Sequence, residues 1–173
     1  MKGTIVKCLE ELVVTQFGRD KWEQSLKDSG LSTSLIIWPM SDIDDAQVKE
    51  LLAAVCKNLN ITLVQAADAF GDYWVNVYTQ KMYPLFYTRN TTARDFLLDL
   101  NNLHVQMTRT MEQARPPRFE YEWKDDKTLI MYYKSHRSLI DLMVGLAKGV
   151  GRYYQEDIQV TKLGPDKVQI IFA

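Results

Sequence analysis

Apolar residues recur at steps of three and four through most of the first 111 residues, and this spacing predicts a helical amino-terminal half. The first predicted helix runs from Ile5 to Phe17 and ends at Gly18, a residue type that commonly follows helices. Further helices are expected over 20–27, from a cap at Asp42 or Asp44 to Leu59, over 61–78 and over 96–111. The segment 31–40 has no regular period, so we expect it to be irregular.

The pattern changes after Pro116-Pro117, because proline lacks the backbone donor that a continuing helix needs. Residues 119–123 and 128–134 flank a turn at Asp125-Asp126, which predicts a β-hairpin. Residues 139–150 predict a helix, and it is so apolar that other parts of the protein must cover most of its surface. A second hairpin is expected over 157–163 and 167–172. The predicted fold class is α+β, with the helical half packed on a carboxy-terminal part that contains an antiparallel sheet.

The composition is that of one soluble globular domain, which we expect to span residues 1–173. A net charge of −1, with scattered Lys and Arg, lacks the basic footprint that a nucleic-acid partner requires. No apolar stretch is long enough to span a membrane, and the amino terminus lacks the apolar core of a signal peptide. Cys8 and Cys56 lie within helical patterns, where we interpret them as small buried hydrophobes. These features predict a cytoplasmic location.

Gly71 interrupts the predicted helix 61–78. A glycine inside a helix costs about 1 kcal/mol relative to alanine. Its presence indicates either the close approach of another element or bound group, or simple tolerance.

Two features of the second half together suggest a bound heme. Tyr133, Ser135 and Arg137 alternate in a segment expected to be extended, so they can present two hydroxyls and a guanidinium to one pair of carboxylates such as heme propionates. Upstream, His104 lies on the apolar face of the predicted helix 96–111 and can supply an axial nitrogen to iron. Each feature has a plainer interpretation, a solvated strand face for the first and a satisfied core histidine for the second.

Four motifs, in matching order and spacing, resemble the heme-nitric oxide/oxygen-binding (H-NOX) family, whose domains also form the heme-binding part of animal soluble guanylate cyclases. The resemblance covers essentially the whole chain. The motifs are the opening Met1–Ile5, the stretch Asp95–His104, the corner Arg115–Phe119 and the set Tyr133, Ser135 and Arg137.

The resemblance implies a heme b buried between the helical half and the sheet. His104 would be the proximal iron ligand, and Tyr133, Ser135 and Arg137 would hold the propionates. Four apolar residues would pack against the heme: Ile5, Leu9, Pro117 and Leu146. Gly145, together with Leu146, would match a tight approach of the helix to the heme.

The distal gas pocket implied by the resemblance contains Trp74, Leu142 and Gly145. Family members that hold oxygen resemble one another in having a tyrosine where this chain has Leu142. Bound oxygen needs a distal hydrogen-bond donor, whereas nitric oxide binds ferrous heme well without one. Leu142 therefore favours nitric oxide and carbon monoxide. The indole of Trp74 could donate to oxygen, although we expect it mainly to line the pocket. Tyr73 and Tyr78 cannot be placed from sequence.

The first hypothesis is a sensor in which nitric oxide weakens the bond to His104 and changes the surface that a partner contacts. By resemblance to stand-alone bacterial domains, the partner would be a separate histidine kinase or a cyclic-dinucleotide enzyme, because the sequence stops at Ala173. An oxygen-binding domain or oxygen carrier, and a heme-free interaction domain, are the alternatives.

An enzyme is a further hypothesis, either a heme peroxidase or a hydrolase. A peroxidase needs a distal acid-base residue, yet the only other histidine, His136, is expected on the opposite side of the segment from the three propionate-binding side chains. Ser135, His136 and Asp141 are close in sequence, but neighbouring strand residues point apart, so a nucleophilic triad is not expected.

Overall fold

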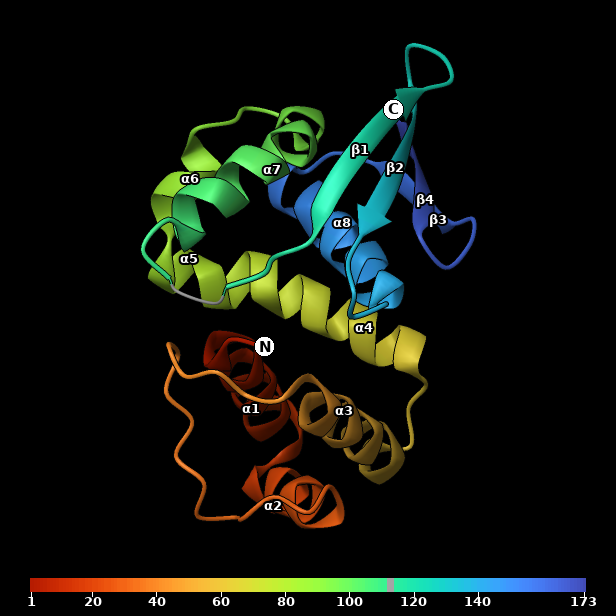
Figure 1. Cartoon of the computed structure of the whole chain (residues 1–173). Helices are drawn as coiled ribbons and strands as arrows, with labels where there is room; N and C mark the ends of the chain where they lie inside the picture. Colours follow the sequence, from red (N-terminus) through yellow and green to blue (C-terminus); the bar gives the residue numbers. More distant parts are fainter. Residues whose placement is uncertain (112–113) are drawn as a thin grey trace. The chain divides into compact units, whose positions relative to one another are not determined.

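The computed structural model describes residues 1–111 and 114–173. The chain forms two compact units, Met1–Ala66 and Ala67–Ala173. Figure 1 follows the chain from red at the amino terminus to blue at the carboxy terminus. Among the described residues, no helix combines the length and apolar character that crossing a bilayer requires.

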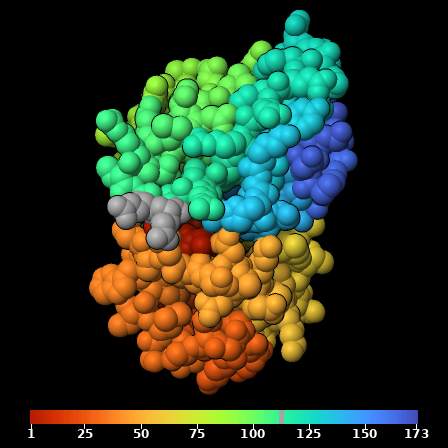
Figure 2. Space-filling view, in the orientation of Figure 1, coloured from red at the N-terminus to blue at the C-terminus, as the bar shows by residue number. Residues whose placement is uncertain are grey.

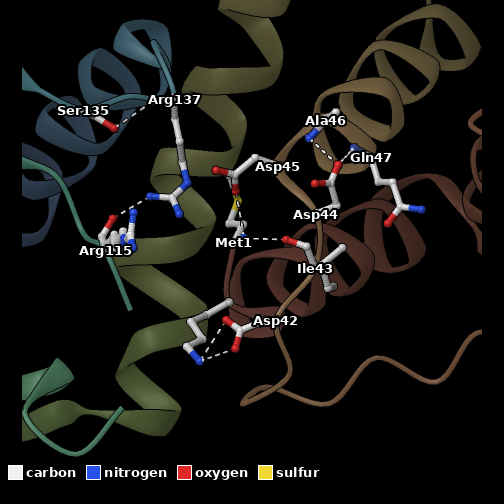
Figure 3. A network of polar contacts seen from close by, with 11 residues as sticks. Met1, Asp42, Ile43, Asp44, Asp45, Ala46, Gln47, Arg115, Ser135 and Arg137 are labelled. Atoms are coloured by element: carbon white, nitrogen blue, oxygen red, sulfur yellow. Dashed lines mark hydrogen bonds and ion pairs between the residues drawn. The ribbon is translucent and has the colours of Figure 1, made fainter. Parts of the chain in front are cut away.

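Three helices build the first unit: α1 (Gly3–Phe17), α2 (Arg19–Asp28) and α3 (Asp45–Leu59). Gly18 separates α1 from α2 with a φ of 94°, a backbone conformation that favours glycine. The Asp44 carboxylate caps α3 by accepting from the amides of Ala46 and Gln47, at 2.9 and 3.1 Å, as Figure 3 shows. The amino-terminal ammonium of Met1 lies 2.8 Å from the next carboxylate, that of Asp45.

The core of this unit is formed by the apolar faces of its helices, and its most buried members include Val6, Cys8, Leu12, Trp22, Leu26, Leu51 and Val55. Cys8 is buried as expected, whereas Cys56 is only partly buried. The segment 31–40 has no helix or strand, as predicted. It runs over the surface of this unit, in orange in Figure 2, and exposes the apolar side chains of Leu35, Ile36, Trp38 and Met40.

The predicted helix 61–78 is not uniform. It consists of α4 (Leu63–Tyr73) followed by a wide π-helical turn, η1 (Trp74–Tyr78), and the chain then continues into α5 (Thr79–Met82). A short helix that the sequence did not predict, α6 (Pro84–Thr88), comes next. The helix that carries His104, α7 (Ala93–Thr108), ends three residues before the predicted Met111.

The sheet has four antiparallel strands in the order β1-β2-β4-β3. The strands are β1 (Arg118–Trp123), β2 (Thr128–Lys134), β3 (Ile158–Lys162) and β4 (Lys167–Phe172). Both predicted hairpins are therefore present, and they join through β2 and β4. The helix α8 (Ile140–Tyr154) lies between the hairpins in sequence and packs against the sheet in Figure 1. This arrangement confirms the predicted α+β class.

The second core lies where α7 and α8 cover one face of this sheet. Alternate residues of β2 and β4 point to it, and the register pairs Leu129 with Ile170 and Met131 with Val168. Phe119 of β1 pairs with Tyr133 of β2, so these two aromatic rings share the covered face. The sheet thus fixes Tyr133 beside the strand that follows Pro117.

Helices α4 and α8 approach each other at the level of their backbones. A Cβ atom added at Gly71 would lie 2.1 Å from the carbonyl carbon of Gly145, and one added at Gly149 would lie 2.6 Å from the carbonyl oxygen of Gly71. Of the two interpretations offered for Gly71, the close approach of another element is the one observed. The ion pairs Lys148–Asp68 and Arg152–Asp72 flank this crossing.

Candidate functional site

His104 lies on α7 at the point where the helix faces the start of β1. Its Nδ1 atom is 3.1 Å from the carbonyl oxygen of Pro117, and its ring centroid is 5.7 Å from that of Phe119. A carbonyl oxygen can only accept, so Nδ1 must carry the proton and donate it. The lone pair of the imidazole then remains on Nε2. This tautomer is the one that a histidine ligand needs when its other nitrogen is fixed by the protein.

The surroundings of His104 favour the neutral imidazole. Burial lowers the pKa of His104, and the charge of Arg118 lowers it further, while the hydrogen bond to Pro117 opposes part of this shift. A metal ligand must be unprotonated at the coordinating nitrogen. The site therefore keeps the ring in the form that can bind a metal near neutral pH.

Asn101, one helical turn before His104, links α7 to β1 through two hydrogen bonds. Its Nδ2 donates to the carbonyl of Phe119 at 2.8 Å, and its Oδ1 accepts from the Phe119 amide at 3.0 Å. Tyr121 adds a third contact by donating to the carbonyl of Leu97 at 2.9 Å. Asn101 was not predicted as a site residue, although its spacing of three residues from His104 placed it on the same helix face.

The region expected to hold carboxylates departs from the predicted geometry. β2 ends at Lys134, and His136–Arg137 form a turn, so the alternation of an extended strand does not continue to Arg137. The turn is held by the Arg137 amide, which donates to the Ser135 hydroxyl at 3.2 Å. The Arg137 guanidinium donates to the carbonyl of Arg115 at 2.6 Å, as Figure 3 shows. The turn thus brings Arg137 beside the corner that contains Pro117.

Tyr133 is buried, and its ring centroid is 6.2 Å from that of Phe119. The rings of His104, Phe119 and Tyr133 therefore form a continuous series from α7 to β2. Lys134 points the other way, is exposed and lies 3.5 Å from the Glu120 carboxylate. Strand alternation thus separates Tyr133 from its neighbour as predicted.

The residues assigned to a distal pocket lie on α4, η1 and α8. Trp74 begins η1, where its indole stacks with Phe70 and Tyr78 at centroid distances of 5.8 and 5.6 Å. Leu142 and Leu146 are one turn apart on α8 and half-buried, and Leu146 and Trp74 pack against the same apolar cluster. Tyr73 and Tyr78, which sequence could not place, are both buried.

Further observations bear on the hydrolase and metal-binding hypotheses. The Asp141 carboxylate is engaged by Lys162, whose Nζ lies 2.9 Å from Oδ1, and His136 is exposed. The described residues contain no group of three or more His, Cys, Asp or Glu placed to hold a metal ion.

Comparison with known proteins gives consistent results. A family model described as Haem-NO-binding matches residues 2–162. Soluble guanylate cyclase gcy-32 of Caenorhabditis elegans is 25% identical over 169 residues, which cover 95% of this chain and 25% of that protein. Soluble guanylate cyclase gcy-34 of the same organism is 25% identical over 159 residues, which cover 88% of this chain and 23% of that protein. The chain thus spans about a quarter of the length of these relatives.

Solved structures extend the comparison to the whole fold. A Cs H-NOX mutant with 4-cyano-L-phenylalanine at site 5 superposes with a TM-score of 0.88 and 26% identity, covering 99% of this chain and 96% of that chain. An oxygen-binding H-NOX domain related to soluble guanylate cyclases, solved as its oxygen complex, gives a TM-score of 0.82 at 26% identity and covers 99% of this chain and 95% of that one.

Proposed function

Because the chain belongs to the Haem-NO-binding family of H-NOX domains, we propose that it binds heme b through His104 and senses nitric oxide at the heme iron. The observation that carries the proposal is the hydrogen bond from Nδ1 of His104 to the Pro117 carbonyl, which leaves Nε2 as the coordinating atom. The heme supplies an iron centre that takes a diatomic gas. The protein would supply one coordinating nitrogen, binding groups for the heme carboxylates and a pocket for the gas.

The donor set fits the carboxylates of such a group. Arg137 and Ser135 lie in one turn, and Tyr133 precedes it on the covered face of β2. We propose that these three side chains hold the heme propionates, because a guanidinium and hydroxyls match carboxylate lone pairs. We also propose that Pro117, Leu146, Ile5 and Leu9 pack against the macrocycle.

Ligand choice in this proposal depends on Leu142. Its side chain cannot donate a hydrogen bond, so a pocket formed by Trp74, Leu142 and Gly145 would favour nitric oxide and carbon monoxide over oxygen. Two observations favour the alternative of an oxygen-binding domain or carrier: the Trp74 indole has a hydrogen-bond donor, and a relative described as oxygen-binding shares the fold. Spectra of the ferrous protein in air distinguish the two proposals, because only the second predicts a stable oxygen complex.

Signalling would pass to a separate protein in the cytoplasm, and we propose a histidine kinase or a cyclic-dinucleotide enzyme as the partner, with no membrane or nucleic acid involved. The curated relatives are guanylate cyclases of which this chain matches about a quarter, so a cyclase output domain is the other possible partner. The domain itself would perform no catalysis. Co-purification of the domain with each class of enzyme, with and without nitric oxide, tests this part of the proposal.

The central test is the variant His104→Gly, which removes the coordinating nitrogen. We expect it to lose the heme Soret absorption and to recover it when free imidazole is added, since imidazole can occupy the vacated position. The matched control is His136→Gly, which removes the only other histidine from an exposed turn and should keep its heme. Full retention of the ferrous heme spectrum by His104→Gly without imidazole would refute the assignment.

A further inference from the structure

The wide turn η1, which begins at Trp74, is held by a buried hydroxyl. The Trp74 carbonyl accepts from the backbone amide of Thr79 and also from the Thr79 hydroxyl, whose oxygen lies 2.7 Å away. Gln80 supports the next carbonyl, that of Val75, through its side-chain amide at 2.8 Å. A π turn departs from regular helical hydrogen bonding and recurs at functional sites. Side-chain donors therefore stabilise this turn where a regular helix would need none.

The Thr79 hydroxyl takes part in a second short hydrogen bond, 2.7 Å from the hydroxyl of Tyr87 on α6. A threonine hydroxyl has one proton, and the Trp74 carbonyl can only accept, so that proton points to Trp74. Tyr87 must then donate to Thr79. The three groups form a directed series from Tyr87 through Thr79 to the Trp74 carbonyl. Both side chains are buried, with exposed fractions of 5% and 3%.

The Tyr87 ring is fixed by its aromatic neighbours. It stacks on Phe96 at 4.8 Å with an interplanar angle of 9°, and it contacts Tyr153 at 4.8 Å. Because α7 and α8 supply these two rings, the hydroxyl that begins the series is anchored to the core of the second unit. The backbone position of Trp74 is thus tied to that core through two hydroxyls.

We propose that Thr79 and Tyr87 are positioning residues that fix the wide turn and thereby set how the Trp74 side chain meets the gas ligand. This inference rests on the proposed function, in which Trp74 lines the gas pocket. Neither residue is proposed to touch the gas. Loss of the Thr79 hydroxyl leaves the Trp74 carbonyl without its side-chain donor, and loss of the Tyr87 hydroxyl removes the group that orients the Thr79 hydroxyl. Either change allows the turn to relax toward a regular helix. The indole then changes its position relative to a bound gas.

The test uses the ferrous carbon monoxide complex of the full chain. Thr79→Val and Tyr87→Phe each remove one hydroxyl while keeping the shape of the side chain. We expect both to shift the C–O stretching frequency and to change the carbon monoxide dissociation rate by about fivefold, equivalent to roughly 1 kcal/mol. We also expect faster amide hydrogen exchange in a peptide that covers 74–79, measured with and without heme.

Two matched controls separate positioning from general destabilisation. Thr79→Ser keeps the hydroxyl and should behave as the wild type. Tyr154→Phe removes another hydroxyl from the same aromatic cluster, one that donates to the Tyr87 carbonyl at 2.8 Å, and should leave the stretching frequency unchanged. The inference is overturned if the heme-bound Thr79→Val and Tyr87→Phe proteins keep the wild-type frequency and exchange rates. A wild-type protein that binds no heme would instead overturn the proposed function, and the exchange measurement on the heme-free chain would still test the turn.

Discussion

Gly145→Ala should destabilise the second unit, because α4 and α8 meet at their backbones at this residue. An added Cβ would lie 2.0 Å from the Ala67 carbonyl oxygen and 2.5 Å from its carbon. The helices would have to separate by about 1.4 Å, the difference between 2.0 Å and an ordinary contact of 3.4 Å. Neither obstructing atom belongs to a side chain that can rotate away, so the strain falls on the helix crossing.

The expected magnitude combines two opposing effects. Overpacking a close contact costs about 1–3 kcal/mol and sometimes more, and here backbone atoms must move. Replacing glycine by alanine inside a helix returns up to about 1 kcal/mol. A net loss of about 2 kcal/mol corresponds to a fall in Tm of roughly 4–8 °C for a chain of this size.

Thermal unfolding followed by circular dichroism at equal heme occupancy measures this loss. Gly164→Ala is the matched control, because its Cβ would find its nearest neighbour, an oxygen of Asp166, at 3.9 Å. The double variant Gly71→Ala, Gly145→Ala should lose less than the sum of the single variants, since the first substitution already separates the helices. An unchanged Tm in Gly145→Ala, or additive losses in the double variant, would contradict the packing argument.

Three further predictions concern the site and the sheet. Arg137→Ala should sharply lower heme retention, by about 3 kcal/mol if the propionates are well covered, whereas Lys134→Ala on the exposed side of β2 should not; equal heme loss in both argues against the propionate assignment. Leu142→Tyr should raise oxygen affinity roughly tenfold or more by adding a donor, as spectra in air would record, and an unchanged affinity would mean that Leu142 does not decide ligand choice. Burial and the Asp99 carboxylate raise the pKa of Tyr121 to about 12 from 10.0. The neutral phenol therefore stabilises the fold below pH 10, and this contribution is lost as the pH rises toward 12. Tyr121→Phe should flatten that loss in urea unfolding, and a pH profile identical to the wild type would oppose this interpretation.

The sequence predicted the elements whose burial has a clear period. The apolar residues around His104 recur with the period of a helix, and the residues on either side of Asp125-Asp126 alternate with the period of a strand. Both predicted elements are present. The wide turn at Trp74 gave no such signal, because one extra residue per turn changes the register without changing which residue types are apolar. The turn after Lys134 was missed for a related reason: Ser135–Arg137 contains neither glycine nor proline, and Ser138 adopts a positive φ of 54° without being glycine.

The candidate site divides in the same way. Residue type and spacing were enough to propose His104 and Arg137 as candidate binding residues. Their partners in the structure are the carbonyls of Pro117 and Arg115. Every residue has a carbonyl, so sequence gives no sign of which one a donor will reach. Which carbonyl each donor reaches depends on how α7 and β1 are arranged in the folded chain.

That choice of partner has a consequence for how the site tolerates mutation. Because a backbone atom fixes the tautomer of His104, no substitution at position 117 can delete the acceptor; it can only move it. Variants of Pro117 therefore report on the shape of the corner while the proton stays on Nδ1. In the proposed function, Nε2 would therefore remain the coordinating nitrogen when position 117 changes, whereas its placement would shift with the side chain at that position.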